Sequence, residues 1–273
     1  HLPYIPYLKA AGELKTKPTQ HSVKELQSVG IQPDILVLRT EKHLDDDVRR
    51  KVAAFCNVDL DCVVQSEDLA SIYEVPVNMQ KQGLDVAILR KTGEPIGPTP
   101  ELGPWKAFLE RQKKATREVH IGLVGKYDLQ DAYKSIRESL SQAGTYNDYK
   151  TKITFINSEY ITEENVAEKL KGQDGIVICP GFGQRGIEGK IITAHYTRTH
   201  DIPTFGICLG MQMMVIEFAR NVLGYIDANS REIDEKTKHN VIDIMEEQKN
   251  ITNMGGTMRL GAYECDLKQG SHV

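Results

Sequence analysis

The amino-acid sequence predicts an α/β protein made of two modules. Its 273 residues correspond to about two domains of ordinary size. In both halves, short apolar runs rich in β-forming residues alternate with amphipathic stretches, which is typical of parallel sheets covered by helices. Glycine and proline cluster between the halves, in GEPIGPTPELGP at 93–104. We therefore expect a first domain at 1–80, a linker at 81–117 and a second domain at 118–273.

In the first module, the signals for helices and strands alternate along the chain. The stretch from Ser22 to Leu26 has a helical pattern, and IQPDILVLR at 31–39 is typical of a buried strand. DDDVRRKVAAFCNV at 45–58 predicts a helix with an acidic first turn. CVVQSEDLASIYEVP then predicts a strand, a turn with Ser66 as N-cap, and a short helix that ends before Pro76.

The second module follows a short amphipathic helix expected at 105–114, and its alternation is clearer. Strands are expected at 119–127, 152–156, 175–180 and 202–207, and helices at 131–144, 164–172, 188–200 and 209–224. Ligands of parallel sheets bind beyond the carboxyl ends of the strands. The segments to inspect are therefore Gly125–Tyr127, Pro180–Gly183 and Gly206–Gly210.

Composition and charge exclude several classes of protein. The chain has 40% hydrophobic and 26% charged residues, as ordinary globular proteins do, which excludes disordered and fibrous classes. A net charge of -4 argues against non-specific binding of nucleic acid. No apolar run reaches the roughly 18 residues that span a bilayer, and the first residues lack the order of a signal peptide. We therefore expect a cytoplasmic protein with no nucleic-acid or membrane partner.

The cysteines are expected to be reduced thiols. They are scattered without metal-ligand spacing, so no metal site is expected within the chain: Cys56, Cys62, Cys179, Cys208 and Cys265.

GICLG, at Gly206 to Gly210, is the most specific of the three motifs. It joins an apolar strand directly to a helix, where a nucleophile on a tight turn needs small neighbours. Cys208 would then lie at a helix N-terminus, where the dipole favours the thiolate and the N–H of Leu209 can donate to an oxyanion. A buried cysteine in an ordinary turn is the alternative reading.

A glycine-rich turn, GFGQRG at Gly181 to Gly186, matches the dinucleotide-binding pattern. However, Asp201 precedes the next strand, whereas the acidic residue that binds the ribose must follow that strand. NAD is therefore disfavoured, and the turn is better suited to supply oxyanion donors. GQRGIEGK also fails as a P-loop, because the first glycine and the hydroxyl residue after Lys190 are missing.

KTKPTQHSVKEL, from Lys15 to Leu26, is the third motif. Lys15 and Lys17 flank the start of a helix, where cations and free backbone N–H groups together suit a triphosphate or another polyanion. A solvated helix start remains the alternative.

Cysteine catalysis normally requires a base, usually histidine. No histidine of the second module stands in a motif that would place it beside Cys208: His120, His195, His200, His239 and His272.

Taken together, these motifs resemble the glutamine-hydrolysing cytidine triphosphate synthase family, which belongs to the class I glutamine amidotransferases. The resemblance runs from His1 to Val273 and rests on KTKPTQHSVKEL, VGIQPDIL, FCNV, GKY with DAYKS, PGFGQRGIEGK, GICLGMQ, DANS and GGTMRLGA. It implies that the first module is the C-terminal part of a P-loop-like amidoligase (synthetase) domain. The second module would be a parallel-sheet class I glutaminase-like domain, incomplete at its C-terminus.

The resemblance also implies an activity and its ligands. UTP would be aminated to CTP with ATP and Mg²⁺, using ammonia released from glutamine. GTP would act as activator and CTP as product inhibitor. The family implies tetramers built as dimers of dimers, which sometimes form filaments.

The roles of individual residues follow from the same resemblance. Cys208 would be the glutaminase nucleophile. Glutamine would be held by Gly181, Leu209, Gly210, Met211, Gln212, Glu232 and Arg259. UTP or CTP would contact Lys15, Thr16, Lys17, Pro18, Thr19, Gln20 and Lys51, and ATP would contact Glu67, Asp68 and Leu69. Phe182 and Arg185 are similar in position to residues implicated in GTP activation.

The chain departs from the family pattern at two points. The family usually has PGGFG where this chain has Cys179 to Gly183, so Pro180 replaces a glycine and offers no N–H. We expect Gly181 to be the oxyanion donor instead. In addition, the resemblance places the P-loop and the magnesium carboxylates before residue 1, and the general base with its glutamate after residue 273.

Two further functions remain open. A stand-alone cysteine hydrolase or glutaminase of the same fold would not need the Lys15–Gln20 cluster. A non-enzymatic filament or interaction module would carry an inert Cys208.

Overall fold

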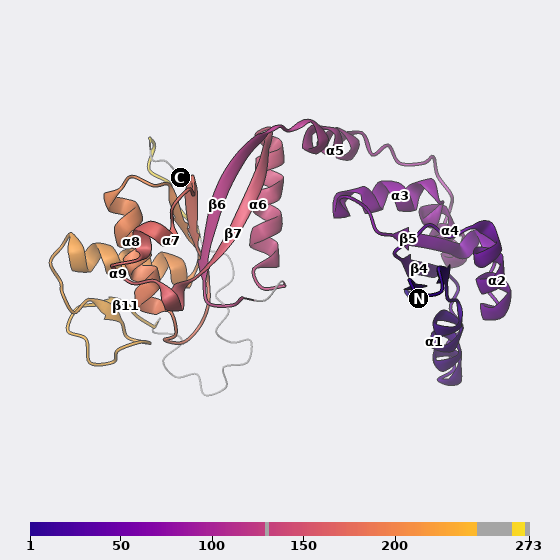
Figure 1. Cartoon of the computed structure of the whole chain (residues 1–273), viewed down its shortest axis with the longest axis horizontal. Coiled ribbons are helices and arrows are strands. Elements are labelled where there is room, and N and C mark those ends of the chain that lie inside the picture. Colours follow the sequence, from indigo (N-terminus) through magenta and orange to yellow (C-terminus); the bar gives the residue numbers. More distant parts are fainter. Residues whose placement is uncertain (129–130, 245–263, 271–273) are drawn as a thin grey trace. The chain divides into compact units, whose positions relative to one another are not determined.

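Two compact units, His1–Lys114 and Ala115–Val273, make up the chain. The computed structural model describes residues 1–128, 131–244 and 264–270 (Figure 1). Both units contain parallel sheets flanked by helices, which confirms the predicted α/β class.

A three-stranded parallel sheet in the order β1-β4-β5 organises the first unit. Its strands are β1 (Tyr4–Ile5), β4 (Leu36–Thr40) and β5 (Val63–Glu67), with a small antiparallel pair formed by β2 (Tyr7–Leu8) and β3 (Glu13–Leu14). Helices α1 (Lys17–Ser28) and α2 (Asp46–Cys56) accompany the sheet. Alternate residues of β4, Leu36 and Leu38, are fully buried with Val23 of α1 and Val52 of α2. This packing defines the core of the first unit.

Helix α2 begins and ends as its sequence predicts. The Asp45 side chain accepts a hydrogen bond from the Val48 N–H at 2.8 Å, and Asp46 and Asp47 occupy the first turn, where the dipole favours negative charge. Asn57 ends the helix in the left-handed conformation.

The helix near Pro76 differs from the prediction. Ser66 lies within strand β5 and caps no helix, while Ser71 accepts from the Tyr73 N–H at the short turn η2 (Ile72–Glu74). Helix α3 (Val75–Lys81) begins at Val75 with Pro76 in its first turn, whereas the prediction had a helix end before this proline. A proline in the first turn loses no intrahelical hydrogen bond and has the φ that a helix needs.

Much of the expected linker is helical and packs against the first unit. Helix α4 (Leu84–Thr92) buries Ala87 in the core described above. Helix α5 (Gly103–Lys114) begins close to the predicted position and packs Phe108 edge-on against Tyr73, with ring centroids 5.3 Å apart. Trp105 of α5 donates to the Tyr73 carbonyl at 2.7 Å. Residues of α4 and α5 therefore belong to the first unit.

The second unit contains a four-stranded parallel sheet in the order β7-β6-β8-β9 (Figure 1). Its strands are β6 (Arg117–Gly125), β7 (Tyr149–Asn157), β8 (Gly175–Ile178) and β9 (Thr204–Gly206). The helices are α6 (Lys134–Tyr146), α7 (Val166–Lys169), α8 (Ile187–Thr199) and α9 (Leu209–Asn221), with a further turn η3 (Ser158–Tyr160). The predicted alternation is confirmed. A short parallel pair, β10 (Asn229–Ser230) and β11 (Asn240–Ile242), was not predicted.

The strand order of this sheet places a ligand crevice. The chain leaves β6 toward β7 and returns on the other side of β6 as β8, so the order reverses between β6 and β8. Crevices for ligands form at the carboxyl ends of strands beside such a reversal. Here those ends are followed by Lys126 and by the segment 179–183.

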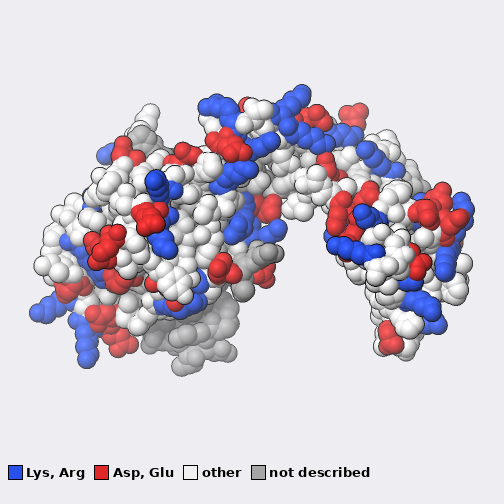
Figure 2. All heavy atoms as spheres, in the orientation of Figure 1, with Lys and Arg blue, Asp and Glu red and all other residues white. Residues whose placement is uncertain are grey.

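The surface of both units carries interspersed charges. On the face drawn in Figure 2, Lys and Arg alternate with Asp and Glu on each unit, in keeping with the small net charge of -4. Among the described helices, none has the length and apolar character required to cross a membrane.

Candidate active site

Cys208 occupies a strained turn between β9 and α9. It is the N-cap residue of α9, and its φ of 53° and ψ of -111° are conformations that residues with a side chain rarely adopt. Its side chain is exposed. This combination of strand, strained exposed residue and helix is the geometry of a nucleophile elbow.

The two glycines around Cys208 leave no space for a side chain. A Cβ added to Gly206 would lie 2.6 Å from the Met211 nitrogen. One added to Gly210 would overlap the carbonyl oxygen of Ile178, at the end of β8. The small residues of GICLG are therefore required by the close approach of α9 to the sheet.

Helix α9 presents backbone N–H groups at this point. The N–H of Gly210 bonds to the Ile207 carbonyl at 2.9 Å, and that of Gln212 to the Cys208 carbonyl at 3.1 Å. The N–H of Leu209, as the first of the helix, has no acceptor within α9. It can donate to negative charge that develops next to Cys208.

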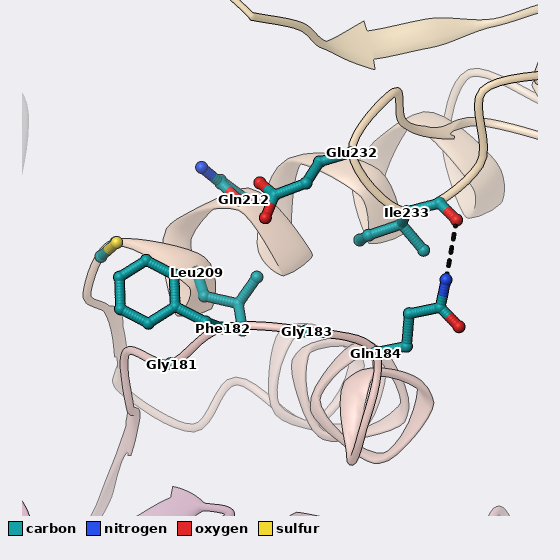
Figure 3. Close-up of a pocket in the computed structure, with 9 residues that line it drawn as sticks. Gly181, Phe182, Gly183, Gln184, Leu209, Gln212, Glu232 and Ile233 are labelled. Carbon is teal, nitrogen blue, oxygen red and sulfur yellow. Dashed lines mark hydrogen bonds between the residues drawn. The ribbon is translucent and has the colours of Figure 1, made fainter. Parts of the chain in front are cut away.

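An open cavity lies at the turn. It is lined by Gly181, Phe182, Gly183, Gln184, Cys208, Leu209, Gln212, Glu232 and Ile233. Figure 3 shows Glu232 and Gln212 on one side and the Gly181–Gln184 loop on the other. Gln184 donates to the Ile233 carbonyl at 3.2 Å, which ties the loop to the segment that carries Glu232.

Most of the residues expected to bind glutamine meet at this cavity. Gly181, Leu209, Gln212 and Glu232 line it together with Cys208, and Gly210 is buried in the turn. Met211 is different. Its side chain is 47% exposed and lines an apolar groove of α9, because it points to another face of the helix. Arg259 lies outside the described residues.

A hydrogen-bonded pair holds the segment that carries Glu232. The Asp227 carboxylate pairs with His239 and accepts from the Lys238 N–H at 3.0 Å, so it closes the segment 227–239 into a loop. The hydrogen bond with His239 lowers the pKa of Asp227 below its usual value. Tyr225 stacks on the His239 ring, with centroids 4.4 Å apart.

Two lysines that are absent from the predicted site residues hold the glycine-rich loop. Lys126, directly after β6, donates to the carbonyls of Phe182 and Gly183, the latter at 3.0 Å. Lys190, in the first turn of α8, donates to the Cys179 carbonyl at 2.6 Å. Burial lowers the pKa of both, that of Lys190 to about 8. The sequence pointed to Lys126 only through the segment Gly125–Tyr127, and to Lys190 only as a lysine within the apolar pattern of α8.

The residues expected to mediate GTP activation lie in the same glycine-rich loop. Phe182 lines the cavity and is 80% exposed. Arg185 forms an ion pair with Glu159 at 2.6 Å and lies 5.8 Å from the centroid of the Tyr127 ring. An exposed aromatic beside a cation suits stacking with a planar ligand.

The predicted nucleotide segment forms the N-terminus of α1. Thr16 occupies the N-cap position without a capping hydrogen bond from its side chain, and Lys17 and Pro18 of the first turn are exposed. Thr19 is fully buried, and its hydroxyl donates to the Tyr4 carbonyl of β1 at 2.8 Å. Its side chain therefore fixes the helix to the sheet, which leaves only its backbone N–H for a ligand. Gln20 donates to the Thr16 hydroxyl at 3.1 Å.

The Glu13 carboxyl interacts with two of the lysines predicted to bind a nucleotide, Lys15 and Lys51. Lys15 forms an ion pair with Glu13, and the charge of Lys51, from α2, also acts on that carboxyl. The hydrogen bond from Lys15 is the main reason why the pKa of Glu13 is lowered. Lys51 therefore lies within electrostatic range of the carboxyl that pairs with Lys15, and its contact with UTP or CTP stays a prediction.

The residues expected at ATP follow strand β5. Glu67 ends the strand, and Asp68 pairs with Arg39 of β4. Leu69 is half-buried in a groove within the first unit, beside residues of α3 and α5 such as Val77 and Leu109.

One group of described side chains is close enough to share a metal ion: Asp59, Asp61 and Cys62. This group does not fit magnesium, because Asp59 pairs with Lys91, Asp61 pairs with Arg90, and a buried thiol is a poor ligand for a hard cation.

No histidine is among the described residues that line the cavity at Cys208. His195 pairs with the buried Glu217 at 2.9 Å, and His239 pairs with Asp227. His272 lies outside the described residues.

Comparison with known proteins identifies both units. The family model of the CTP synthase N-terminus matches residues 1–93, and that of class-I glutamine amidotransferases matches residues 128–272. CTP synthases of Bacteroides thetaiotaomicron and Bacteroides fragilis are 73% and 70% identical over 99% and 100% of this chain. The chain spans 51% of the length of each.

A solved structure of the Trypanosoma brucei CTPS glutaminase domain with bound acivicin is also similar. It is 38% identical, with a TM-score of 0.46, over 48% of this chain and 52% of that one. Because the class-I glutamine amidotransferase model matches more than half of the chain, the chain belongs to that family.

Proposed function

We propose that the natural protein containing this chain is a CTP synthase, which hydrolyses glutamine at Cys208 and uses the ammonia to aminate UTP in an ATP-dependent reaction. The observation that carries the proposal is the strained, exposed Cys208 at the N-terminus of α9, facing a cavity that Glu232 also lines. The relatives named CTP synthase support the choice of reaction.

The cavity suits the two ends of glutamine. The carboxylate of Glu232 can pair with the α-ammonium group, and the Gln212 amide can hydrogen-bond either end. The carboxamide would then reach Cys208, with the N–H groups of Leu209 and Gly181 directed at its oxygen. We assign the α-carboxylate to Arg259, following the family resemblance.

The chemistry proceeds by addition and elimination. The Cys208 thiolate attacks the carboxamide carbon, and the carbonyl electron pair moves to oxygen to give an oxyanion. The nitrogen of this intermediate accepts a proton. Collapse of the intermediate then breaks the C–N bond, and the nitrogen leaves as ammonia. Water then hydrolyses the thioester to glutamate and free thiol. We assign the proton transfers to the histidine and glutamate that the resemblance places beyond residue 273.

The first unit would contribute to nucleotide binding. Lys15, Lys17 and Lys51 supply cations for the UTP or CTP phosphates beside the free N–H groups of α1. The segment Glu67–Leu69 would contact ATP, with Mg²⁺ bound by carboxylates outside this chain. Ammonia would pass between the two active sites. GTP would act at Phe182 and Arg185, and the enzyme would be a cytoplasmic tetramer able to form filaments.

Replacement of Cys208 tests the proposal directly. In the natural enzyme, Cys208→Ala should reduce glutamine-dependent CTP synthesis by more than about a thousandfold while leaving ammonia-dependent synthesis unchanged, because only the first route needs the thiolate. Cys265→Ala, at another exposed thiol, is the matched control and should change neither rate.

Other outcomes separate the alternatives. Loss of both activities in folded Cys208→Ala would contradict the assigned role. Glutaminase activity without any CTP synthesis in the wild type would favour a stand-alone hydrolase. Absence of both from the wild type, with an inert Cys208, would favour an interaction module.

A further inference from the structure

Lys190 is a buried cation with an unusual set of partners. Its side chain is fully buried in the first turn of α8. Its ammonium lies 2.6 Å from the Cys179 carbonyl oxygen and 3.5 Å from that of Pro180. Among the described residues, no carboxylate pairs with it. A buried ammonium that compensates only backbone carbonyls is costly, which indicates a specific task.

These carbonyls belong to the loop that faces Cys208. In a trans peptide unit the C=O and the N–H point in opposite directions. A donor that holds the Pro180 carbonyl therefore turns the N–H of Gly181 away from itself. Tyr133 donates to the same carbonyl at 3.4 Å and supports this orientation.

Pro180 increases the dependence on that orientation. The peptide between Cys179 and Pro180 has no N–H, so the first donor of this loop is the N–H of Gly181. Lys126 holds the carbonyls of Phe182 and Gly183 farther along the loop. Gly181, which lines the cavity, thus lies between peptide units that two buried lysines hold.

We propose that Lys190 is a positioning residue of the glutaminase site, which directs the Gly181 N–H at the oxyanion by holding the Cys179 and Pro180 carbonyls. This proposal rests on the glutaminase role of Cys208 given above.

The charged groups around Lys190 are consistent with this role. Burial is the main cause of its lowered pKa, and repulsion from Lys126 acts in the same direction. Negative charge on Cys179 or Cys208 acts in the opposite direction. Burial raises the pKa of the Cys179 thiol to about 12, so the Lys190 ammonium is held by carbonyl oxygens rather than by a thiolate of Cys179.

The test compares Lys190→Met with Lys190→Arg in the natural enzyme. Release of glutamate is followed as a function of glutamine concentration. For Lys190→Met we expect the glutaminase kcat to fall about 10- to 100-fold, because the oxyanion donor is no longer directed. The glutamine KM should change less than twofold, and ammonia-dependent synthesis should not change. Lys190→Arg, which keeps a charged donor, should recover most of the kcat.

Lys169→Met removes an exposed lysine of α7 and is the matched control, with no expected effect. An unchanged kcat in folded Lys190→Met overturns the proposal. If that variant does not fold, Lys190→Gln, which lacks the charge and the length of lysine, should lower the kcat in the same direction without a change in KM. Failure of both neutral variants to fold also overturns it, because Lys190 would then be structural. Cys208→Ala removes glutamate release whatever residue stands at 190, so failure of this proposal is distinguished from failure of the proposed function.

Discussion

The turn at Cys208 and the segment Lys15–Gln20 are fixed by different forces. The turn is held by buried backbone, where Gly210 lies against the Ile178 carbonyl and two buried lysines hold the neighbouring loop. The segment is held only in part. Thr19 is anchored to β1, whereas Lys17 is exposed and Lys15 is paired with Glu13 on the surface.

This difference matches what each site is proposed to do. Covalent catalysis requires a nucleophile and oxyanion donors fixed within fractions of an ångström, which close packing provides. Phosphates can be bound by mobile cations, because charge attracts over several ångströms. Substitutions in the turn should therefore have large effects with a sharp steric origin, and substitutions in the segment should have smaller effects that depend on salt.

Gly210→Ala should have the largest effect. The added methyl group would overlap the Ile178 carbonyl and push α9 from the sheet. We expect a loss of glutaminase kcat of at least about 100-fold and a lower stability by about 3 kcal/mol, measured by kinetics and denaturant unfolding. Gly97→Ala, where nothing lies within 4 Å, is the control. Equal effects of the two variants would contradict the steric account.

Glu217→Gln should have the second largest effect. Glu217 is buried on α9 and accepts from Arg198 at 2.7 Å and from His195 at 2.9 Å, both on α8. We expect the free energy of unfolding to fall by about 2 kcal/mol at neutral pH. Glu188→Gln, at an exposed ion pair with Arg220, should cost less than about 0.5 kcal/mol.

The same carboxylate predicts a pH dependence. Burial alone would raise the pKa of Glu217, but the hydrogen bonds from Arg198 and His195 lower it below the usual value of 4.5. The stabilisation of the fold by the Glu217 carboxylate is therefore fully present above pH 4.5 and is lost as the pH falls through the lowered pKa. The stability difference between wild type and Glu217→Gln should shrink on acidification, and a constant difference would contradict this.

Lys15→Ala combined with Lys17→Ala should have an intermediate effect confined to nucleotide binding. We expect the KM for UTP to rise about tenfold at low salt and less at high salt, because exposed charges are screened. Basal glutaminase activity should stay constant. Lys24→Ala, at an exposed position later in α1, is the control. An unchanged KM for UTP would contradict the proposed role of Lys15 and Lys17 in nucleotide binding.

Asp227→Asn should have the smallest effect. The variant weakens the hydrogen bond with His239 that closes the loop carrying Glu232, so the glutamine KM should rise about threefold with little change in kcat. Since the pKa of Asp227 is lowered, its stabilisation is lost as the pH falls below about 4. Melting temperatures at pH 7 and pH 3 check the sign, because wild type should lose more on acidification than Asp227→Asn.

The sequence predicted Cys208 because its motif is contiguous and the constraints on its glycines are local. Glu232 and Gly181 came only from the family resemblance, since their approach to Cys208 depends on how the strands are ordered in the sheet. Lys190 was missed because a sequence does not say which lysine of a helix faces the core. Met211 shows a limit of a contiguous motif. The motif does not say which face of α9 each side chain occupies, and Met211 lies away from the cavity.

Errors in the fold have similar causes. Pro76 was read as the end of a helix, although proline is equally compatible with a first turn. Helix α4 was hidden in a region called a linker from its glycines and prolines, yet Ala87 packs into the core. Strands β1 to β3 have two residues each, too few for a visible alternation, and they form through contacts distant in the sequence.

The backbone at Cys208 also restricts which residues could replace it. A φ of 53° is poorly tolerated by β-branched side chains. Threonine nucleophiles are therefore excluded from this position on conformational grounds, whereas serine differs from cysteine by one atom and keeps the same freedom. Evolutionary drift or laboratory selection for a new nucleophile would have to pass through serine, or first rebuild the turn.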